Sequence, residues 1–203
     1  MAPTDILDQD DNRRRYFDKA MSKTVVQVVQ GDFYVTNQPG EVLTTILGSC
    51  ISACVRDPKI GYGGMNHFLL PSPGDLGSAV NTSLRYGSFA MEQLINAILS
   101  RGGRRENLEI KVFGGGNVIR AASGVGHKNA DFIEEYLANE GFMIASQHLR
   151  GNSARKVLFF PRSGRVRMRE LPSTHADKIH SQEISRAVKV KKTTTPGTVE
   201  LFD

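Results

Sequence analysis

The first half of the chain carries several short apolar runs that are separated by turn-forming residues. Such runs occupy residues 24–29, 41–47, 51–55 and 65–70. Runs of this length, bounded by Gly, Pro, Asp or Ser and containing many β-branched residues, are typical of β-strands. The pattern therefore predicts four strands before the middle of the chain.

The second half contains two segments with helical periodicity. Between residues 83 and 100 the apolar positions fall on one face of a helix. These positions are Tyr86, Met91, Leu94, Ile95, Ile98 and Leu99. A second helix is predicted near residues 129–139, and Gly141 supplies its C-terminal stop.

Further strands are predicted around these helices. One covers residues 108–113 and another residues 142–148, while residues 156–160 and 166–171 form a predicted hairpin. Only two helices accompany these strands, without a regular strand–helix alternation. The sequence therefore predicts an α+β fold, a layered mixed β-sheet sandwich with flanking helices.

The ends of the chain differ in composition from its centre. Residues 1–22 are polar and read as a flexible leader, with a helical tendency near residues 14–20, and residues 173–203 read as a flexible basic tail. Residues 23–172 hold all the periodic segments. We expect these residues to form one domain with a sizeable core.

Composition narrows the class of protein. Hydrophobic residues make up 39% of the chain and charged residues 23%, as in ordinary globular proteins. No stretch approaches the roughly 18 apolar residues of a membrane-spanning helix, and the N-terminus lacks the apolar segment of a secretory signal. These features predict a cytoplasmic protein without membrane insertion.

The net charge is +5, which raises the question of a nucleic-acid partner. Aromatic residues are not interleaved with the basic ones, as they would be on a base-stacking surface. We therefore expect a solvated basic face and no nucleic-acid partner. On the segment 165–169, which alternates arginine with apolar residues, the alternative is a contact for acidic partner helices.

The two cysteines, Cys50 and Cys54, are too few for a disulfide framework, and in a reducing compartment both are thiols. Cys50 follows Gly48-Ser49 at the corner after a predicted strand, where a nucleophile is exposed and backbone N–H groups can face an oxyanion. A thiol at neutral pH needs a neighbouring base to become a thiolate. His67 lies in the next strand-like segment, and antiparallel pairing would bring it close to Cys50.

Structural explanations compete with this chemistry. A free cysteine is commonly a small buried hydrophobe, which is the expectation for Cys54. Cys50, Cys54 and one histidine make a poor zinc site, because zinc takes three or four protein ligands. The glycines 114–116 lack the Gly-Lys-Ser/Thr ending of a phosphate-binding loop, so no nucleotide cofactor is expected.

Several segments resemble the CheD family of chemoreceptor glutamine deamidases. They are Leu47-Gly48-Ser49-Cys50, Gly64-Met65-Asn66-His67-Phe68-Leu69-Leu70-Pro71, Arg85-Tyr86-Gly87, Lys111-Val112-Phe113-Gly114-Gly115, Gly151-Asn152-Ser153-Ala154-Arg155-Lys156-Val157 and Gly164-Arg165-Val166. The resemblance covers residues 25–172 and implies a fold related to bacterial deamidating toxins.

The resemblance also implies a Cys-His-Thr arrangement. The nucleophile falls on Cys50, the base on His67 and the hydroxyl-bearing third member on Thr44. Thr45 remains the alternative, since a shift of one residue turns the other hydroxyl toward the site. The implied substrate is the glutamine side chain of methyl-accepting chemotaxis receptors, with no metal or organic cofactor.

The resemblance leaves one function of another class open. The chain would then be an adaptor that binds receptors or a CheC-like chemotaxis phosphatase, with vestigial or secondary catalysis. A Cys50→Ala variant that kept its signalling activity would favour the adaptor.

Overall fold

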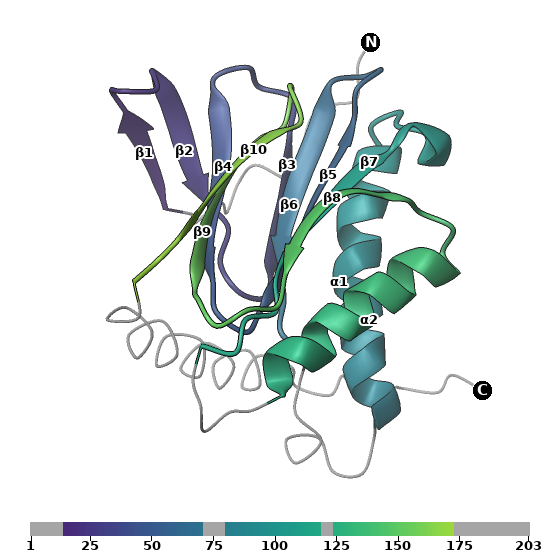
Figure 1. The fold of residues 1–203 in the computed structure, drawn as a ribbon. Coiled ribbons are helices and arrows are strands. Elements are labelled where there is room, and N and C mark those ends of the chain that lie inside the picture. The colour runs from purple at the N-terminus through teal and green to yellow at the C-terminus, as the bar shows by residue number, and fades with distance from the viewer. Residues whose placement is uncertain (1–13, 71–79, 119–123, 173–203) are drawn as a thin grey trace, which may run out of the picture.

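The structure is a computed structural model that describes residues 14–70, 80–118 and 124–172. Two five-stranded sheets face each other and two helices cover one of them (Figure 1). The first sheet has the order β1 (Arg15–Asp18), β2 (Lys23–Gln27), β4 (Glu41–Leu47), β9 (Arg155–Phe160), β10 (Arg165–Glu170). The second has the order β3 (Asp32–Thr36), β6 (Tyr62–His67), β5 (Ile51–Asp57), β7 (Glu109–Gly114), β8 (Ile144–Leu149).

Both sheets are mixed. In the first sheet β2 and β4 are parallel, while β1–β2, β4–β9 and β9–β10 are antiparallel pairs. In the second sheet β5 is antiparallel to β6 and to β7, and β7 runs parallel to β8. The predicted α+β sandwich with flanking helices is confirmed.

The helices α1 (Val80–Leu99) and α2 (Val125–Asn139) lie on the face of the second sheet that points away from the first sheet (Figure 1). A short 3-10 helix, η2 (Arg105–Asn107), leads into β7. Two apolar cores result, one between the sheets and one between the second sheet and the helices. The inter-sheet core contains Val26, Val28, Leu43, Leu47, Cys50, Cys54, Met65, Phe113, Val157 and Phe159.

Strand β5 contributes to both cores, because successive side chains on a strand point to opposite faces. Ile51, Ala53 and Val55 pack toward the helices, whereas Cys50 and Cys54 pack between the sheets. The fold therefore places the thiol of Cys50 between the two sheets.

Residues 15–18 correct the expectation of a helical leader near residues 14–20. They form strand β1, which pairs with β2 from Arg15 opposite Val26 to Asp18 opposite Lys23. The Arg15 guanidinium donates a 2.6 Å hydrogen bond to Glu41, so a long-range contact outweighs the local helical tendency. Residues 1–13 and the predicted tail, 173–203, lie outside the described residues.

The other predicted elements are present with shifted ends. Both helices begin earlier than expected, at Val80 and at Val125, and strand β3 was missed. Among the described residues, no helix combines the length and apolar character needed to cross a membrane.

Candidate active site at Cys50 and His67

Cys50 lies immediately before β5, and its side chain has no exposed surface. Three consecutive carbonyl oxygens hold this turn in place. The N–H of Gly116 donates to Gly48 at 2.9 Å, and the N–H of Gly115 donates to Cys50 at 2.8 Å. The carbonyl between them, that of Ser49, accepts a 2.9 Å hydrogen bond from a side chain on α2.

His67 ends β6 and is 3% exposed. Its position relative to Cys50 follows from the antiparallel pairing of β5 with β6. Ile51 and Phe68 exchange both backbone hydrogen bonds at 2.9 Å, which places Ser52 opposite His67. Cys50 and His67 are therefore diagonal neighbours on one face, a relationship that puts residues roughly 7 Å apart and within reach of a long side chain.

Thr45, rather than Thr44, contacts the imidazole. The hydroxyl oxygen of Thr45 lies 2.7 Å from Nδ1 of His67, whereas the Thr44 hydroxyl donates to the carbonyl of Val157 at 2.9 Å. The two threonines point to opposite faces of β4, and only Thr45 faces the second sheet. The geometry thus corrects the expectation that Thr44 is the hydroxyl partner of His67.

The glycine-rich segment after β7 is shaped to accept the Cys50 turn. Gly114 has φ of +121°, and a Cβ on it would collide with the carbonyl oxygen of Cys50. A Cβ on Gly115 would lie 2.8 Å from the carbonyl oxygen of Gly126 and 2.9 Å from Cβ of Ala130. These glycines let the turn and helix α2 approach each other closely, a role for which glycine is suited.

Arg155 lies beside Gly116 and holds the loop that follows β8. Its side chain is fully buried and donates to the carbonyl of His148 at 2.6 Å, to that of Ser153 at 3.2 Å and to that of Arg150. Burial lowers the pKa of the Arg155 guanidinium, while the charge of Glu170 raises it. Carbonyl partners compensate part of the cost of burying this charge.

Gln30 also reaches the nucleophile. Its Oε1 lies 3.9 Å from Sγ of Cys50, and the side chain is 9% exposed. The next residue, Gly31, donates its backbone N–H to the carbonyl of His67 at 2.7 Å. The turn between β2 and β3 therefore touches both candidate catalytic residues, and no pattern in the sequence indicated this.

Cys54 behaves as the sequence predicted. It is 1% exposed, and burial strongly raises the pKa of its thiol, although Lys111 and Ser52 lower it. A protonated, buried thiol is a poor nucleophile. No cluster of three or more His, Cys, Asp or Glu side chains that could hold a metal ion occurs within residues 14–70, 80–118 and 124–172.

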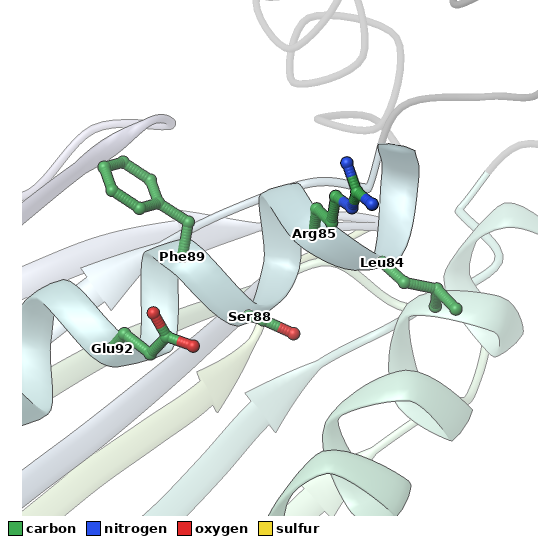
Figure 2. Close-up of a pocket in the computed structure, with 5 residues that line it drawn as sticks. All are labelled: Leu84, Arg85, Ser88, Phe89 and Glu92. Atoms are coloured by element: carbon green, nitrogen blue, oxygen red, sulfur yellow. The ribbon is translucent and has the colours of Figure 1, made fainter. Parts of the chain in front are cut away.

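A shallow surface pocket lies on the outer face of α1. Its lining residues are Leu84, Arg85, Ser88, Phe89 and Glu92, and Figure 2 shows them along one side of the helix. The opposite side of α1, with Met91 and Leu94, is buried against the second sheet. This pocket does not include Cys50 or His67.

Comparison with protein families gives a clear result. The family model described as CheD chemotactic sensory transduction matches residues 69–170. The chain belongs to the CheD family. A relative from Rhodopseudomonas palustris (strain BisA53), named "Probable chemoreceptor glutamine deamidase CheD", is 49% identical over 201 residues, covering 98% of this chain and 94% of that protein.

Other CheD relatives are similar over almost the same length. A protein of the same name from Methylobacillus flagellatus is 47% identical over 191 residues, covering 92% of this chain and 94% of the relative. Similarity to solved structures is remote. The hypothetical protein YfiH of Bacillus licheniformis aligns with a TM-score of 0.38 and 12% identity, covering 60% of this chain and 50% of that one.

Proposed function

We propose that this CheD-family chain is a protein-glutamine glutaminase, which converts glutamine side chains of methyl-accepting chemotaxis receptors to glutamate. The observation that carries the proposal is the placement of Cys50 and His67 as diagonal neighbours on one sheet face, with Thr45 at 2.7 Å from the imidazole. The names of the CheD relatives support the substrate class. In this proposal the enzyme works in the cytoplasm, where thiols stay reduced.

The first half-reaction forms a thioester. The imidazole of His67 accepts the Cys50 thiol proton, and the thiolate attacks the carboxamide carbon of the substrate glutamine. The resulting tetrahedral intermediate carries a negative oxygen, which backbone N–H groups near Ser49 and Cys50 stabilise. His67 then returns the proton to the departing nitrogen, so that ammonia leaves and the S–C bond remains.

The second half-reaction releases glutamate. Water gives a proton to His67 as its oxygen attacks the thioester carbon, and the S–C bond breaks with return of that proton to sulfur. The Thr45 hydroxyl accepts the Nδ1 hydrogen of His67, which directs the other ring nitrogen toward the proton transfers. Because threonine is neutral, it stabilises the imidazolium less than a carboxylate would.

Substrate must reach a thiol that has no exposed surface in this structure. The proposal therefore requires side chains over Cys50 to move when receptor binds. Gln30 is one such group, because its carboxamide lies 3.9 Å from the sulfur.

The test is mass spectrometry of a receptor cytoplasmic fragment after incubation with this protein. We expect specific glutamines to gain the mass that separates an acid from an amide, together with ammonia release. The Cys50→Ala variant is the control and should leave every glutamine unchanged. Receptor that stays fully amidated with the wild-type protein would refute the proposal.

The complete burial of Cys50 favours one alternative, a binding adaptor with vestigial or secondary catalysis. Such an adaptor would dock on receptors or on a CheC-like phosphatase. It predicts that Cys50→Ala retains full signalling activity in cells. Loss of signalling with retained folding and receptor binding would favour the enzyme.

A further inference from the structure

Asn129 on α2 connects the two strands that carry the candidate catalytic residues. Its side chain is fully buried, and both ends of the amide are used. Nδ2 donates to the carbonyl oxygen of Ser49 at 2.9 Å, and Oδ1 accepts from the N–H of Leu70 at 2.9 Å. Ser49 directly precedes the nucleophile, and Leu70 lies three positions after His67.

These two partners are the next expected pair of the β5–β6 ladder. Ile51 and Phe68 exchange both hydrogen bonds, and in an antiparallel ladder the next such pair lies two residues back on one strand and two residues forward on the other. That pair is Ser49 with Leu70. The amide of Asn129 is therefore inserted where a direct N–H to C=O bond between the strands would otherwise form.

The ladder is also altered on the other side of the Ile51–Phe68 pair. There the N–H of Ala53 donates to the side-chain oxygen of Asn66 at 2.8 Å. The pair of Ile51 with Phe68 is accordingly an isolated bridge, bounded on both sides by asparagine amides. On each side of this backbone pair, an asparagine side chain therefore supplies a link between the two strands.

The position of Asn129 is itself fixed. Helix α2 contacts the glycine-rich segment after β7, where a Cβ on Gly115 would collide with Gly126 and Ala130 of the helix. The same Gly115 donates its N–H to the carbonyl of Cys50. Helix, loop and nucleophile turn are therefore one close-packed unit, and the carbonyl of Ser49 is held toward α2.

The planar trans peptide makes that contact directional. Because the Ser49 carbonyl points toward Asn129, the N–H of Cys50 points in the opposite direction within the same peptide plane. The bond thereby sets the direction of this N–H beside the nucleophile. A residue at position 129 must supply one donor and one acceptor at this spacing, which asparagine does and ionised aspartate or leucine does not.

We propose that Asn129 is a positioning residue. Its side-chain amide bridges the Cys50 turn and the strand of His67 and so fixes the separation between them. The inference rests on the proposed function, since it assigns the separation a role in deamidation. Asn129 acts through Ser49 and Leu70 and makes no contact with substrate.

Two variants, Asn129→Ala and Asn129→Asp, test this role in the full chain. Misplacement of reacting groups by about 1 Å can cost roughly 100-fold in rate, so we expect Asn129→Ala to lose about that factor in kcat, with KM for the receptor fragment nearly unchanged. Asn107→Ala is the matched control, because Asn107 bonds Asp57 at the far end of β5. The control should keep the wild-type kcat.

The Asn129→Asp variant supplies a readout that packing alone would not produce. An ionised carboxylate repels the Ser49 carbonyl, whereas the protonated acid can donate to it. Burial raises the pKa of such a carboxyl, so the ratio of variant to wild-type kcat should rise as the pH is lowered through mildly acidic values. A wild-type kcat for Asn129→Ala, or an Asn129→Asp ratio that does not change with pH, would overturn the proposal.

Amide hydrogen exchange separates this inference from the proposed function. Asn129→Ala should lose protection together in peptides covering residues 46–52 and 65–70, while the Asn107→Ala control keeps it. Unchanged exchange in both peptides overturns the positioning role of Asn129, even if the enzyme is active. If the wild-type chain releases no ammonia, the proposed function fails. Joint loss of protection in the two peptides would still support the link that Asn129 makes between the two strands.

Discussion

The Thr45 hydroxyl and Nδ1 of His67 lie 2.7 Å apart, so that one hydrogen bond links the first sheet to the second at the candidate base. Strand β4 carries Thr45 and strand β6 carries His67. In the proposed mechanism this bond selects the tautomer and holds the ring. The relationship distinguishes two adjacent threonines that the sequence could not.

Replacing Thr45 by valine should lower kcat by roughly 10- to 100-fold, because the imidazole loses the group that orients it. The substitution keeps the branched shape and removes the hydroxyl. Ammonia release from a receptor fragment measures the effect.

Thr44→Val is the matched control for that experiment. It removes a hydrogen bond to the Val157 carbonyl, which should cost about 1 kcal/mol in the free energy of unfolding. Its kcat should stay near the wild-type value. A larger loss of kcat in Thr44→Val than in Thr45→Val would contradict the assignment.

Gly114→Ala should be strongly destabilising. Gly114 has φ of +121°, and an added Cβ would collide with the Cys50 carbonyl, so strain and displacement of the turn combine. We expect a loss of about 3 kcal/mol or more in the free energy of unfolding. Urea denaturation measures it.

Gly102→Ala is the comparison for this glycine. Gly102 also has a positive φ, +90°, but nothing lies within 4 Å of its added Cβ. Only the conformational cost of about 1–2 kcal/mol should appear. Equal losses for the two variants would show that the contact with Cys50 contributes nothing.

Arg155→Lys should destabilise the loop around residues 148–153. A lysine cannot reproduce the planar fork that meets several carbonyls at once, so we expect a loss of about 3 kcal/mol in the free energy of unfolding. Arg167→Lys, at an exposed position on β10, should change it by less than about 0.5 kcal/mol. A value for Arg155→Lys within that smaller range would refute the structural role.

The Cys54 thiol should be unreactive toward iodoacetamide in the folded protein. Burial raises the pKa of the Cys54 thiol, so its thiolate fraction at a given pH is below that of a free cysteine, and only a further rise in pH increases it. In the Cys50→Ala variant, we expect Cys54 to remain unmodified in the folded protein between about pH 7 and 9. Urea should expose it to rapid modification.

Modification of native Cys54 at the rate of an unfolded control would contradict this. Peptide mapping assigns the modified residue in each case.

Much of the fold follows from the sequence because most strands are short β-prone segments bounded by turn-forming residues. Strand β4 shows why the direction of individual side chains does not follow from the sequence. Val42 and Leu43 are both fully buried on opposite faces, so the run has no polar alternation that would reveal which threonine points inward. That choice depends on how β4 pairs with β9, a contact between segments far apart in the chain.

The pairing of Cys50 with His67 in the candidate site also follows from the sequence, whereas the contacts of Asn129 do not. Cys50 directly precedes β5 and His67 ends β6, and the antiparallel pairing of these consecutive strands brings the two residues to one face. Asn129 acts over sequence separations of 80 and 59 residues. A helix that lies against both strands creates its role, and an asparagine among the polar residues of an amphipathic helix gives no local sign of it.

Acid quenching of the reaction during turnover should trap the covalent intermediate that the proposed mechanism forms on Cys50. Peptide mapping of the quenched enzyme should find receptor peptide, less ammonia, attached to Cys50 as a thioester that hydroxylamine releases. His67→Ala should show neither adduct nor turnover. Full deamidation of receptor by Cys50→Ala, with no adduct on the wild-type Cys50, would contradict a covalent role for this cysteine.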